Sequence, residues 1–272
     1  MSAAAAIGFL SDYGLRDEFV GVCHGVIARR CPEARVIDIT HAIPRQDVRT
    51  GAITLATALP YLPTGVALAV VDPGVGGPRR ALALRTAVEA RLLVGPDNGL
   101  LMPAAARFGG VQEAFDVGGS RVRLQPMSST FHGRDLFAPV AAALAAGEEL
   151  SSLGDAVPAG ELAQLELPAA RLHDGALSAH VLRIDGFGNV SLDAGASELA
   201  QLGVERGASV TVQAPGSERR ALFAASFADV PAGELVLLED SARTLALAVN
   251  LGSAAELLGL SSFGDELVLR RA

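Results

Sequence analysis

Residues 65–80, GVALAVVDPGVGGPRR, decide how this chain folds. The run at 65–71 is almost continuously apolar, which is typical of a strand covered on both faces of a sheet. Asp72 stands at the tip of this strand, and the Pro-Gly turn after it restricts where the carboxylate can lie. The stretch therefore predicts a layered α/β sheet with an acidic group at a strand end, where such sheets bind their ligands.

The chain on both sides of this stretch alternates short apolar runs with helical periodicity. We expect the α/β fold class, with an N-terminal layered domain built on a largely parallel sheet. The expected strands are 7–11, 36–40, 81–84 and 92–94, and the expected helices are 18–30, 48–59 and 136–146.

The pattern changes after residue 147. Residues 147–175 lack clean periodicity, and short apolar runs separated by Gly, Pro, Asp and Asn follow them. This predicts a smaller β-rich domain. We place the N-terminal α/β domain at 1–165, a linker at 166–175 and the C-terminal β-rich domain at 176–272.

The composition excludes several classes of protein. Half of the 272 residues are hydrophobic and the mean hydropathy is +0.37, which excludes a disordered chain. All 22 basic residues are arginine, so Schiff-base, PLP-lysine and P-loop lysine chemistry are excluded. The net charge of −8 and the lack of a basic run argue against a nucleic-acid partner.

We expect no metal site. The two cysteines, Cys23 and Cys31, cannot form a disulfide framework or a four-ligand zinc site. The histidines outside the motifs below show no HExxH or similar spacing: His24, His41, His173 and His180.

The sequence also predicts a cytoplasmic protein. No basic segment precedes the apolar stretch Ala3–Leu10, which runs into Ser11 as a first strand would, so we expect no signal peptide. No apolar run approaches the ~18 residues that a membrane span requires.

Two further segments carry polar groups suited to chemistry. His132, in STFHGRD at 129–135, stands at the start of an expected helix, whose positive end disfavours the protonated imidazole. In IDGFGNVS at 184–191, Asp185 can hold an ammonium group, and Asn189 offers a donor and an acceptor, as an adenine edge requires. Each has a structural alternative, a histidine bonded to backbone and an ordinary hairpin turn. The strand-end aspartates Asp12 and Asp72 could likewise cap turns or helices.

Taken together, these segments resemble the adenosine-forming S-adenosylmethionine (SAM) hydrolases, or SAM hydroxide adenosyltransferases, which are related to the fluorinating and chlorinating SAM enzymes. The resemblance spans essentially the whole chain. It is carried, in order, by SDYGLRDEFVG, VDPGVGGPRR, GPDNGLL, STFHGRDLFAP, IDGFGNVSL and AVNLGSAAELLGL.

The resemblance implies an N-terminal α/β domain, a β-barrel-like C-terminal domain, and homotrimers that bind SAM between neighbouring subunits. It assigns the catalytic set to Asp72, Arg79 and His132, with Arg80 adjoining Arg79. It assigns substrate binding to Asp12 at the ribose diol, Asp17 near the substrate, Asp185 near the methionine amino group, Asn189 at the adenine edge and Ser241 at the methionine. The chain departs from the halogenating branch at Asp72, where those enzymes have tyrosine, at Ser191, where they have a bulky aromatic residue, and at Ala242, where they have an arginine for the methionine carboxylate.

The implied activity is hydrolysis of SAM to adenosine and L-methionine by attack of water on ribose C5′, without a cofactor. The charged Asp72 is unsuited to a halide pocket, which favours water as the nucleophile. The alternatives are a chlorinase-like SAM halogenase and a non-catalytic sensor of SAM or adenosine. A Rossmann-type methyltransferase is disfavoured, because the first strand ends in SDYG rather than in a glycine-rich turn.

Overall fold

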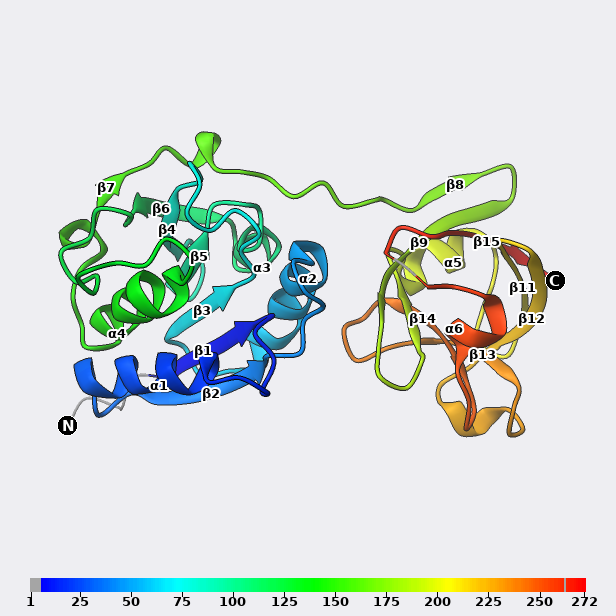
Figure 1. The fold of residues 1–272 in the computed structure, drawn as a ribbon. Helices are drawn as coiled ribbons and strands as arrows, with labels where there is room; N and C mark the ends of the chain where they lie inside the picture. The colour runs from blue at the N-terminus through cyan, green and yellow to red at the C-terminus, as the bar shows by residue number, and fades with distance from the viewer. Residues whose placement is uncertain (1–5, 262) are drawn as a thin grey trace. The chain divides into compact units, whose positions relative to one another are not determined.

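The computed structural model describes residues 6–261 and 263–272, and the chain divides into two compact units, Met1–Glu166 and Leu167–Ala272. We call them the N-terminal and the C-terminal unit. Figure 1 shows the ribbon of both units. Hydrophobic side chains are buried separately within each of them, on both faces of the N-terminal sheet and inside the C-terminal unit. Residues 3–5 of the apolar stretch before the first strand lie outside the described residues.

The N-terminal unit is built on a seven-stranded sheet within the described residues, in the order β2-β1-β3-β5-β4-β6-β7. Its strands are β1 (Ala6–Ser11), β2 (Arg35–Thr40), β3 (Val66–Val70), β4 (Ala81–Thr86), β5 (Leu92–Pro96), β6 (Val111–Asp116) and β7 (Asp155–Ala156). Strands β2, β1, β3 and β5 pair in parallel, whereas β4, β6 and β7 join in antiparallel pairings. The α/β class is confirmed. The sheet is only partly parallel, because the short connection between β4 and β5 permits a hairpin but no crossover.

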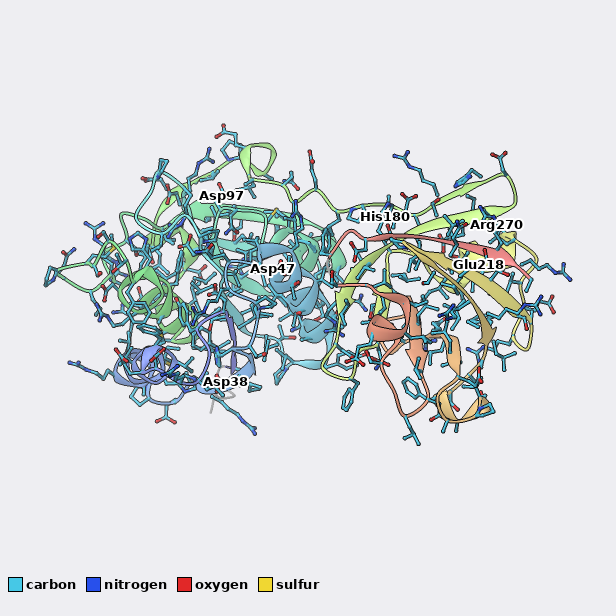
Figure 2. All side chains as sticks on the ribbon, turned by 45° about the vertical axis from the view of Figure 1, so that its right-hand side comes forward. Asp38, Asp47, Asp97, His180, Glu218 and Arg270 are labelled. Atoms are coloured by element: carbon cyan, nitrogen blue, oxygen red, sulfur yellow. The ribbon has the colours of Figure 1, made fainter. Side chains whose placement is uncertain are left out.

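Helices cover both faces of this sheet. They are α1 (Phe19–Arg30), α2 (Val48–Ala58), α3 (Met102–Arg107) and α4 (Ala138–Ala145), with one π-helical turn, η2 (Gly133–Phe137), directly before α4. Short 3-10 turns lie at Leu59–Tyr61, Leu150–Ser152 and Ala159–Glu161. Asp47 caps α2 by accepting a hydrogen bond from Thr50 N at 2.9 Å (Figure 2). None of the helices in the described ranges is long and apolar enough to cross a membrane.

Strand β3 is buried on both faces, as its sequence predicts. Leu68 packs with α1 and α4 in one core, and its neighbours Ala67 and Ala69 pack with α2 and α3 in the other. A fully buried side chain such as Leu68 contributes about 1.5–3 kcal/mol to the free energy of folding. This double cover holds the end of β3, and with it Asp72, in one position.

Within the described residues, the C-terminal unit forms a seven-stranded β-barrel. Its order is β10-β14-β13-β12-β11-β15-β9, closed by pairing of β9 with β10, and β8 adds to β9 outside the ring. The strands are β8 (Arg171–His173), β9 (Ala176–Ile184), β10 (Val190–Leu192), β11 (Ser209–Ala214), β12 (Ser217–Phe223), β13 (Leu235–Glu239), β14 (Leu245–Val249) and β15 (Glu266–Arg271). Two short helices, α5 (Ala196–Gln201) and α6 (Ala254–Leu258), and a 3-10 turn at Phe227–Asp229 complete the unit. Closure confirms the barrel that the resemblance implies, and it leaves no unpaired edge in the ring.

Candidate active site

Three of the predicted residues meet beyond the end of β3. Arg79 donates from Nε to Asp72 Oδ1 and Oδ2 at 3.0 and 3.2 Å, and its Nη2 also bonds Asp72 Oδ2. The same Nη2 lies 2.8 Å from Nδ1 of His132. The Asp72 and Arg79 side chains are only 6% and 12% exposed, and His132 is buried. The structure thus joins an acid, a guanidinium and an imidazole from two distant loops into one group, which we call the triad.

The contacts within the triad fix the form of the imidazole. A guanidinium can only donate, so Nδ1 of His132 is the acceptor and the neutral ring carries its proton on Nε2. Burial and the charge of Arg79 lower the pKa of His132, and Asp72 and Asp135 oppose them only in part. The imidazole is therefore neutral at pH 7, as the sequence analysis expected from the helix start. The causes in the structure are burial and the charge of Arg79.

The turn after β3 is held by a side chain that the sequence analysis did not assign. Asn98 donates from Nδ2 to the Val71 carbonyl at 2.9 Å, directly before Asp72. Its Oδ1 accepts from Leu100 N at 3.2 Å, so both ends of the amide are used. The GPDNGLL motif contained this residue, and the signal for its role is the turn-forming Asp-Asn-Gly sequence.

The loops that carry Arg79 and His132 pack backbone against backbone. Gly76 has φ +75°, and a Cβ at this position would lie 2.3 Å from the Ser129 carbonyl oxygen. Gly76 therefore lets the two loops approach closely enough for the triad to form. Gly133, next to His132, leaves room for a side chain from a third loop, because a Cβ there would lie 2.0 Å from the hydroxyl of Tyr13.

The loop after β1 contributes Asp12 and Tyr13. Asp12 Oδ2 accepts from Gln46 N at 2.9 Å, and the Tyr13 ring packs edge-on against Phe131 at 5.7 Å. Burial, with Cys23, Asp12 and Asp72 near it, raises the pKa of Tyr13, so this phenol stays protonated. Tyr13 is a second residue that the sequence analysis left without a role. Asp17 lies in an exposed part of the same loop.

The other predicted residues line a pocket of about 330 Å³ in the C-terminal unit. Asp185 Oδ1 accepts the backbone N–H of Phe187 and of Asn189, each at 2.9 Å, and its Oδ2 accepts from Asn189 Nδ2 at 2.9 Å. The tight turn and the binding role are thus compatible, because Asp185 shapes the turn that presents Asn189. Ser241 lines the same pocket.

Among the lining residues that were not predicted, two bring an aromatic ring and a guanidinium to the pocket. Phe227 is 46% exposed and offers an aromatic face to the pocket. Arg183 supplies a guanidinium of the kind that binds carboxylates. Arg243, the arginine next to Ala242, instead pairs with Glu239 at 2.8 Å.

Family models match both units. The model of the SAM hydroxide adenosyltransferase N-terminal domain matches residues 7–154, and that of the C-terminal domain matches residues 179–267. The chain belongs to the SAM hydroxide adenosyltransferase family.

Relatives within and beside this family agree over almost the whole length. An (R)-S-adenosyl-L-methionine hydrolase of Salinispora tropica is 49% identical, over 98% of both chains. A fluorinase of Nocardia brasiliensis is 30% identical, over 92% of this chain and 91% of its own. The crystal structure of an uncharacterized conserved protein from Thermotoga maritima superposes with a TM-score of 0.92 at 37% identity, covering 97% of this chain and 100% of that one. The expected kinship with fluorinases is therefore confirmed.

Proposed function

We propose that this SAM hydroxide adenosyltransferase hydrolyses SAM to adenosine and L-methionine. The observation that carries the proposal is the buried triad, which joins Asp72 to Arg79 and Arg79 to His132 through direct hydrogen bonds. Membership of the family and 49% identity to an (R)-S-adenosyl-L-methionine hydrolase support it.

The reaction is an in-line displacement at ribose C5′. The water oxygen forms a bond to C5′ while the C5′–S bond breaks, and the sulfonium leaves as the neutral thioether of methionine. The leaving group therefore needs no general acid, and the chemistry needs no cofactor. Correct placement of the water can lower the barrier by up to ~7–11 kcal/mol. Removal of its proton by a positioned base adds about 10²–10⁴-fold in rate.

The contacts within the triad support a different role for each of its three residues. Asp72 orients the water and accepts its proton, and Arg79, which stays charged, stabilises developing hydroxide character but is no base. Because Arg79 occupies Nδ1 of His132, that ring acts as a partner that holds the guanidinium rather than as the first proton acceptor.

The remaining predicted residues bind the substrate. Asp12 accepts hydrogen bonds from the ribose diol, with Asp17 nearby. Asn189 binds the adenine edge, Asp185 lies near the methionine amino group and Ser241 contacts the methionine. Phe227 offers the adenine ring a stacking surface. We further propose a cytoplasmic homotrimer in which neighbouring subunits share each site.

The test is turnover of SAM in isotopically labelled water, with separation of the products. We expect adenosine with the label in its 5′-hydroxyl, which identifies both the bond broken and the attacking group. Bound SAM without any adenosine would instead support a sensor, and 5′-chloro-5′-deoxyadenosine formed in the presence of chloride would support a halogenase.

The decisive variant is Asp72→Asn, which keeps the shape of the side chain but removes the proton acceptor. Loss of the base lowers kcat by about 10²–10⁴-fold. SAM affinity, measured by calorimetry, should change little, since Asp72 acts on the water. Wild-type turnover in this variant would remove Asp72 from the mechanism.

A further inference from the structure

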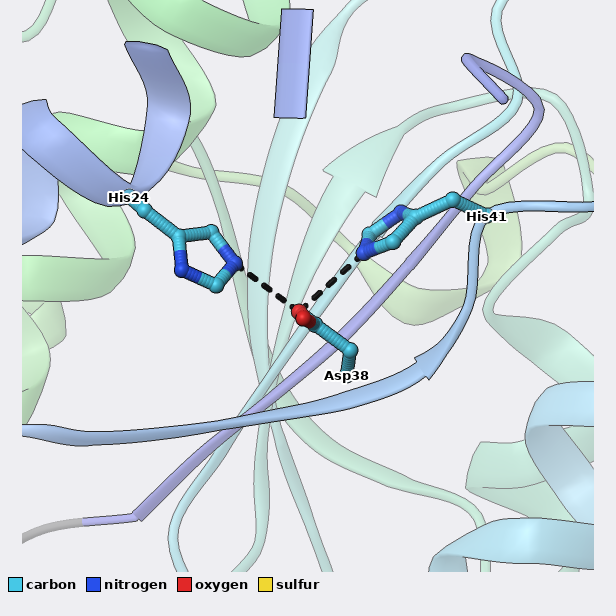
Figure 3. A group of neighbouring side chains, drawn as sticks. All are labelled: His24, Asp38 and His41. Atoms are coloured by element: carbon cyan, nitrogen blue, oxygen red, sulfur yellow. Dashed lines mark hydrogen bonds and ion pairs between the residues drawn. The ribbon is translucent and has the colours of Figure 1, made fainter. Parts of the chain in front are cut away.

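Two imidazoles converge on one carboxylate beside β1. His24 comes from α1, Asp38 from β2 and His41 from the residue after β2. Nε2 of His24 lies 2.8 Å from Asp38 Oδ1, and Nε2 of His41 lies 3.1 Å from the same oxygen. Figure 3 shows both rings pointing at the carboxylate, and one donor atom from each residue lies within 4.8 Å of the other two. We call these residues the His-Asp-His cluster.

His41 is held rigidly within this cluster. Its side chain is 2% exposed, its ring packs edge-on against Phe9 at 4.6 Å, and its Nδ1 lies 2.7 Å from the hydroxyl of Ser11. Its Nε2 is buried and forms an ion pair of 3.1 Å with Asp38 Oδ1, but none of the described residues makes a well-aligned hydrogen bond to it. A buried ring nitrogen without a hydrogen bond is costly unless something else satisfies it.

We propose that His24, Asp38 and His41 bind one divalent transition-metal ion of the zinc class. Two imidazole nitrogens and a carboxylate oxygen suit zinc, cobalt or nickel, whereas magnesium and calcium prefer oxygen ligands alone. Neighbouring ligands of a tetrahedral ion lie about 3.3 Å apart when metal–ligand bonds are ~2.0–2.1 Å. The N···O separations of 2.8 and 3.1 Å would therefore have to widen by a few tenths of an ångström when an ion binds.

The surroundings complete the site. When His41 donates from Nδ1 to Ser11, its Nε2 lone pair faces the ion, because a hydrogen bond at one ring nitrogen fixes the tautomer and the orientation of a metal-bound histidine. The His24 and Asp38 side chains are 35% and 44% exposed, so an ion can enter and keep a water in its open position. The cluster carries one negative charge with neutral imidazoles, which partly offsets the charge of the ion.

The ion would brace the loop that carries Asp12. Ser11, the partner of His41, immediately precedes Asp12, and the His41 carbonyl accepts from Gly14 N at 2.7 Å. No triad residue belongs to the cluster, so the proposal concerns a structural ion and does not depend on the proposed reaction.

The experiment uses the full-length, tag-free protein after removal of metals with a chelator. Co(II) is titrated and followed by calorimetry and by visible absorption. We expect saturable binding of one Co(II) per chain, with ligand-field bands of a nitrogen–oxygen site, displacement by Zn(II), and a rise in Tm in excess metal.

Two near-isosteric variants and one control decide the assignment. His24→Gln and Asp38→Asn should each weaken Co(II) binding by more than about 100-fold, because loss of a residue that only hydrogen-bonds to a metal ligand already costs about 10–100-fold. The control is His180→Gln. His180, labelled in Figure 2, also pairs with an aspartate, Asp193, at 2.7 Å, but the described residues place no third potential ligand beside this pair. The control should bind as the wild type does.

Several results would overturn the proposal. They are the absence of saturable binding to the wild-type protein, binding that both cluster variants retain, and equal loss in His180→Gln. A thiolate-to-cobalt charge-transfer band would place the ion on a cysteine and would count against it in the same way.

Discussion

Arg79 bonds an acid and an imidazole at once, and this double contact sets the charge of the whole triad. If His132 gained a proton, the Arg79 Nη2···Nδ1 hydrogen bond of 2.8 Å would become a contact between two donors that both carry positive charge. Burial opposes the same change. The triad therefore requires a neutral His132, and protonation of this ring at low pH should break its hydrogen bond to Arg79.

This predicts the acid limb of the pH profile. The pKa of His132 lies below its ordinary value of 6.5, so kcat should stay level as the pH falls from 8 to 6.5 and decline only below that. The sign follows because protonation removes the active, neutral form. The measurement is kcat against pH, together with an NMR titration of the His132 ring.

His132→Gln provides the matched control. Its amide oxygen can still accept from Arg79 but does not titrate, so the part of the acid limb that belongs to His132 should disappear. A histidine titration centred above pH 6.5 in the wild type would contradict the proposed environment.

At the scale of elements, the connection from β3 to β4 positions both Asp72 and Arg79. It is held from one side by the Asn98 amide on the Val71 carbonyl and from the other by the contact of Gly76 with Ser129. Neither Asn98 nor Gly76 needs to touch substrate, so each acts by positioning. Their loss should lower kcat more than it changes SAM binding.

Asn98→Ala should lower kcat by about 10–100-fold, because an error of 1 Å in placement costs up to about 10²-fold. Its stability cost should be modest, at about 0.5–1.5 kcal/mol for each lost hydrogen bond. The control is Asn250→Ala, where Nδ2 likewise donates to a carbonyl, that of Val230, at 2.7 Å. Denaturant unfolding and initial rates at saturating SAM test both variants, and equal losses of kcat would refute a positioning role for Asn98.

Gly76→Ala should lower the free energy of unfolding and kcat more than alanine does at another glycine of similar conformation. Gly216 has φ +77° with nothing within 4 Å of an added Cβ, so Gly216→Ala should cost only the left-handed conformation, about 1–2 kcal/mol. Gly76→Ala adds a clash 2.3 Å from a backbone oxygen, so it should lower the free energy of unfolding further and lower kcat as well. Chemical denaturation with activity assays measures both effects. Equal losses of stability and activity in the two variants would show that the close approach of the loops at Gly76 does not contribute to either.

At the scale of the whole molecule, the predicted site residues are divided between two units. The triad and Asp12 belong to the α/β unit, and the pocket with Asp185, Asn189 and Ser241 belongs to the barrel. This division is what the proposed homotrimer, in which neighbouring subunits share each site, requires. Light scattering should then give about 83 kDa, the mass of three 27.8 kDa chains in a closed ring.

Complementation tests the sharing directly. Asp72→Asn and the double variant Asp185→Ala/Asn189→Ala should each be nearly inactive. When they are co-expressed in equal amounts, about one site in three of each mixed ring combines an intact α/β unit with an intact barrel from the neighbour. This is about a quarter of all sites, so about a quarter of the wild-type activity should return. Mixed trimers without recovered activity would show that each site lies within one chain.

The class of the fold and most of its elements were predictable, because each depends on a short stretch of sequence. The members of the triad followed from the resemblance of longer motifs to a known family and not from local pattern. The apolar run 65–71 predicts a strand with both faces covered. The structure confirms this, because the side chains of β3 pack into a separate core on each face of the sheet. The antiparallel half of the sheet was not predictable to the same degree. Local periodicity identifies β4 and β5 as extended segments but contains no information on which strand each will pair with. The strands β6 and β7 were not among the predicted ones.

The sequence alone determined which chemical groups are present and where each lies along the chain, since motifs and periodicity are local. Only the tertiary structure decided which groups meet. His132 reaches Arg79 across 53 residues because two glycine-bearing loops touch, and His24 reaches Asp38 because α1 lies against β2. Sequence spacing therefore predicted no metal site, and long-range packing created the His-Asp-His cluster for which we now propose one.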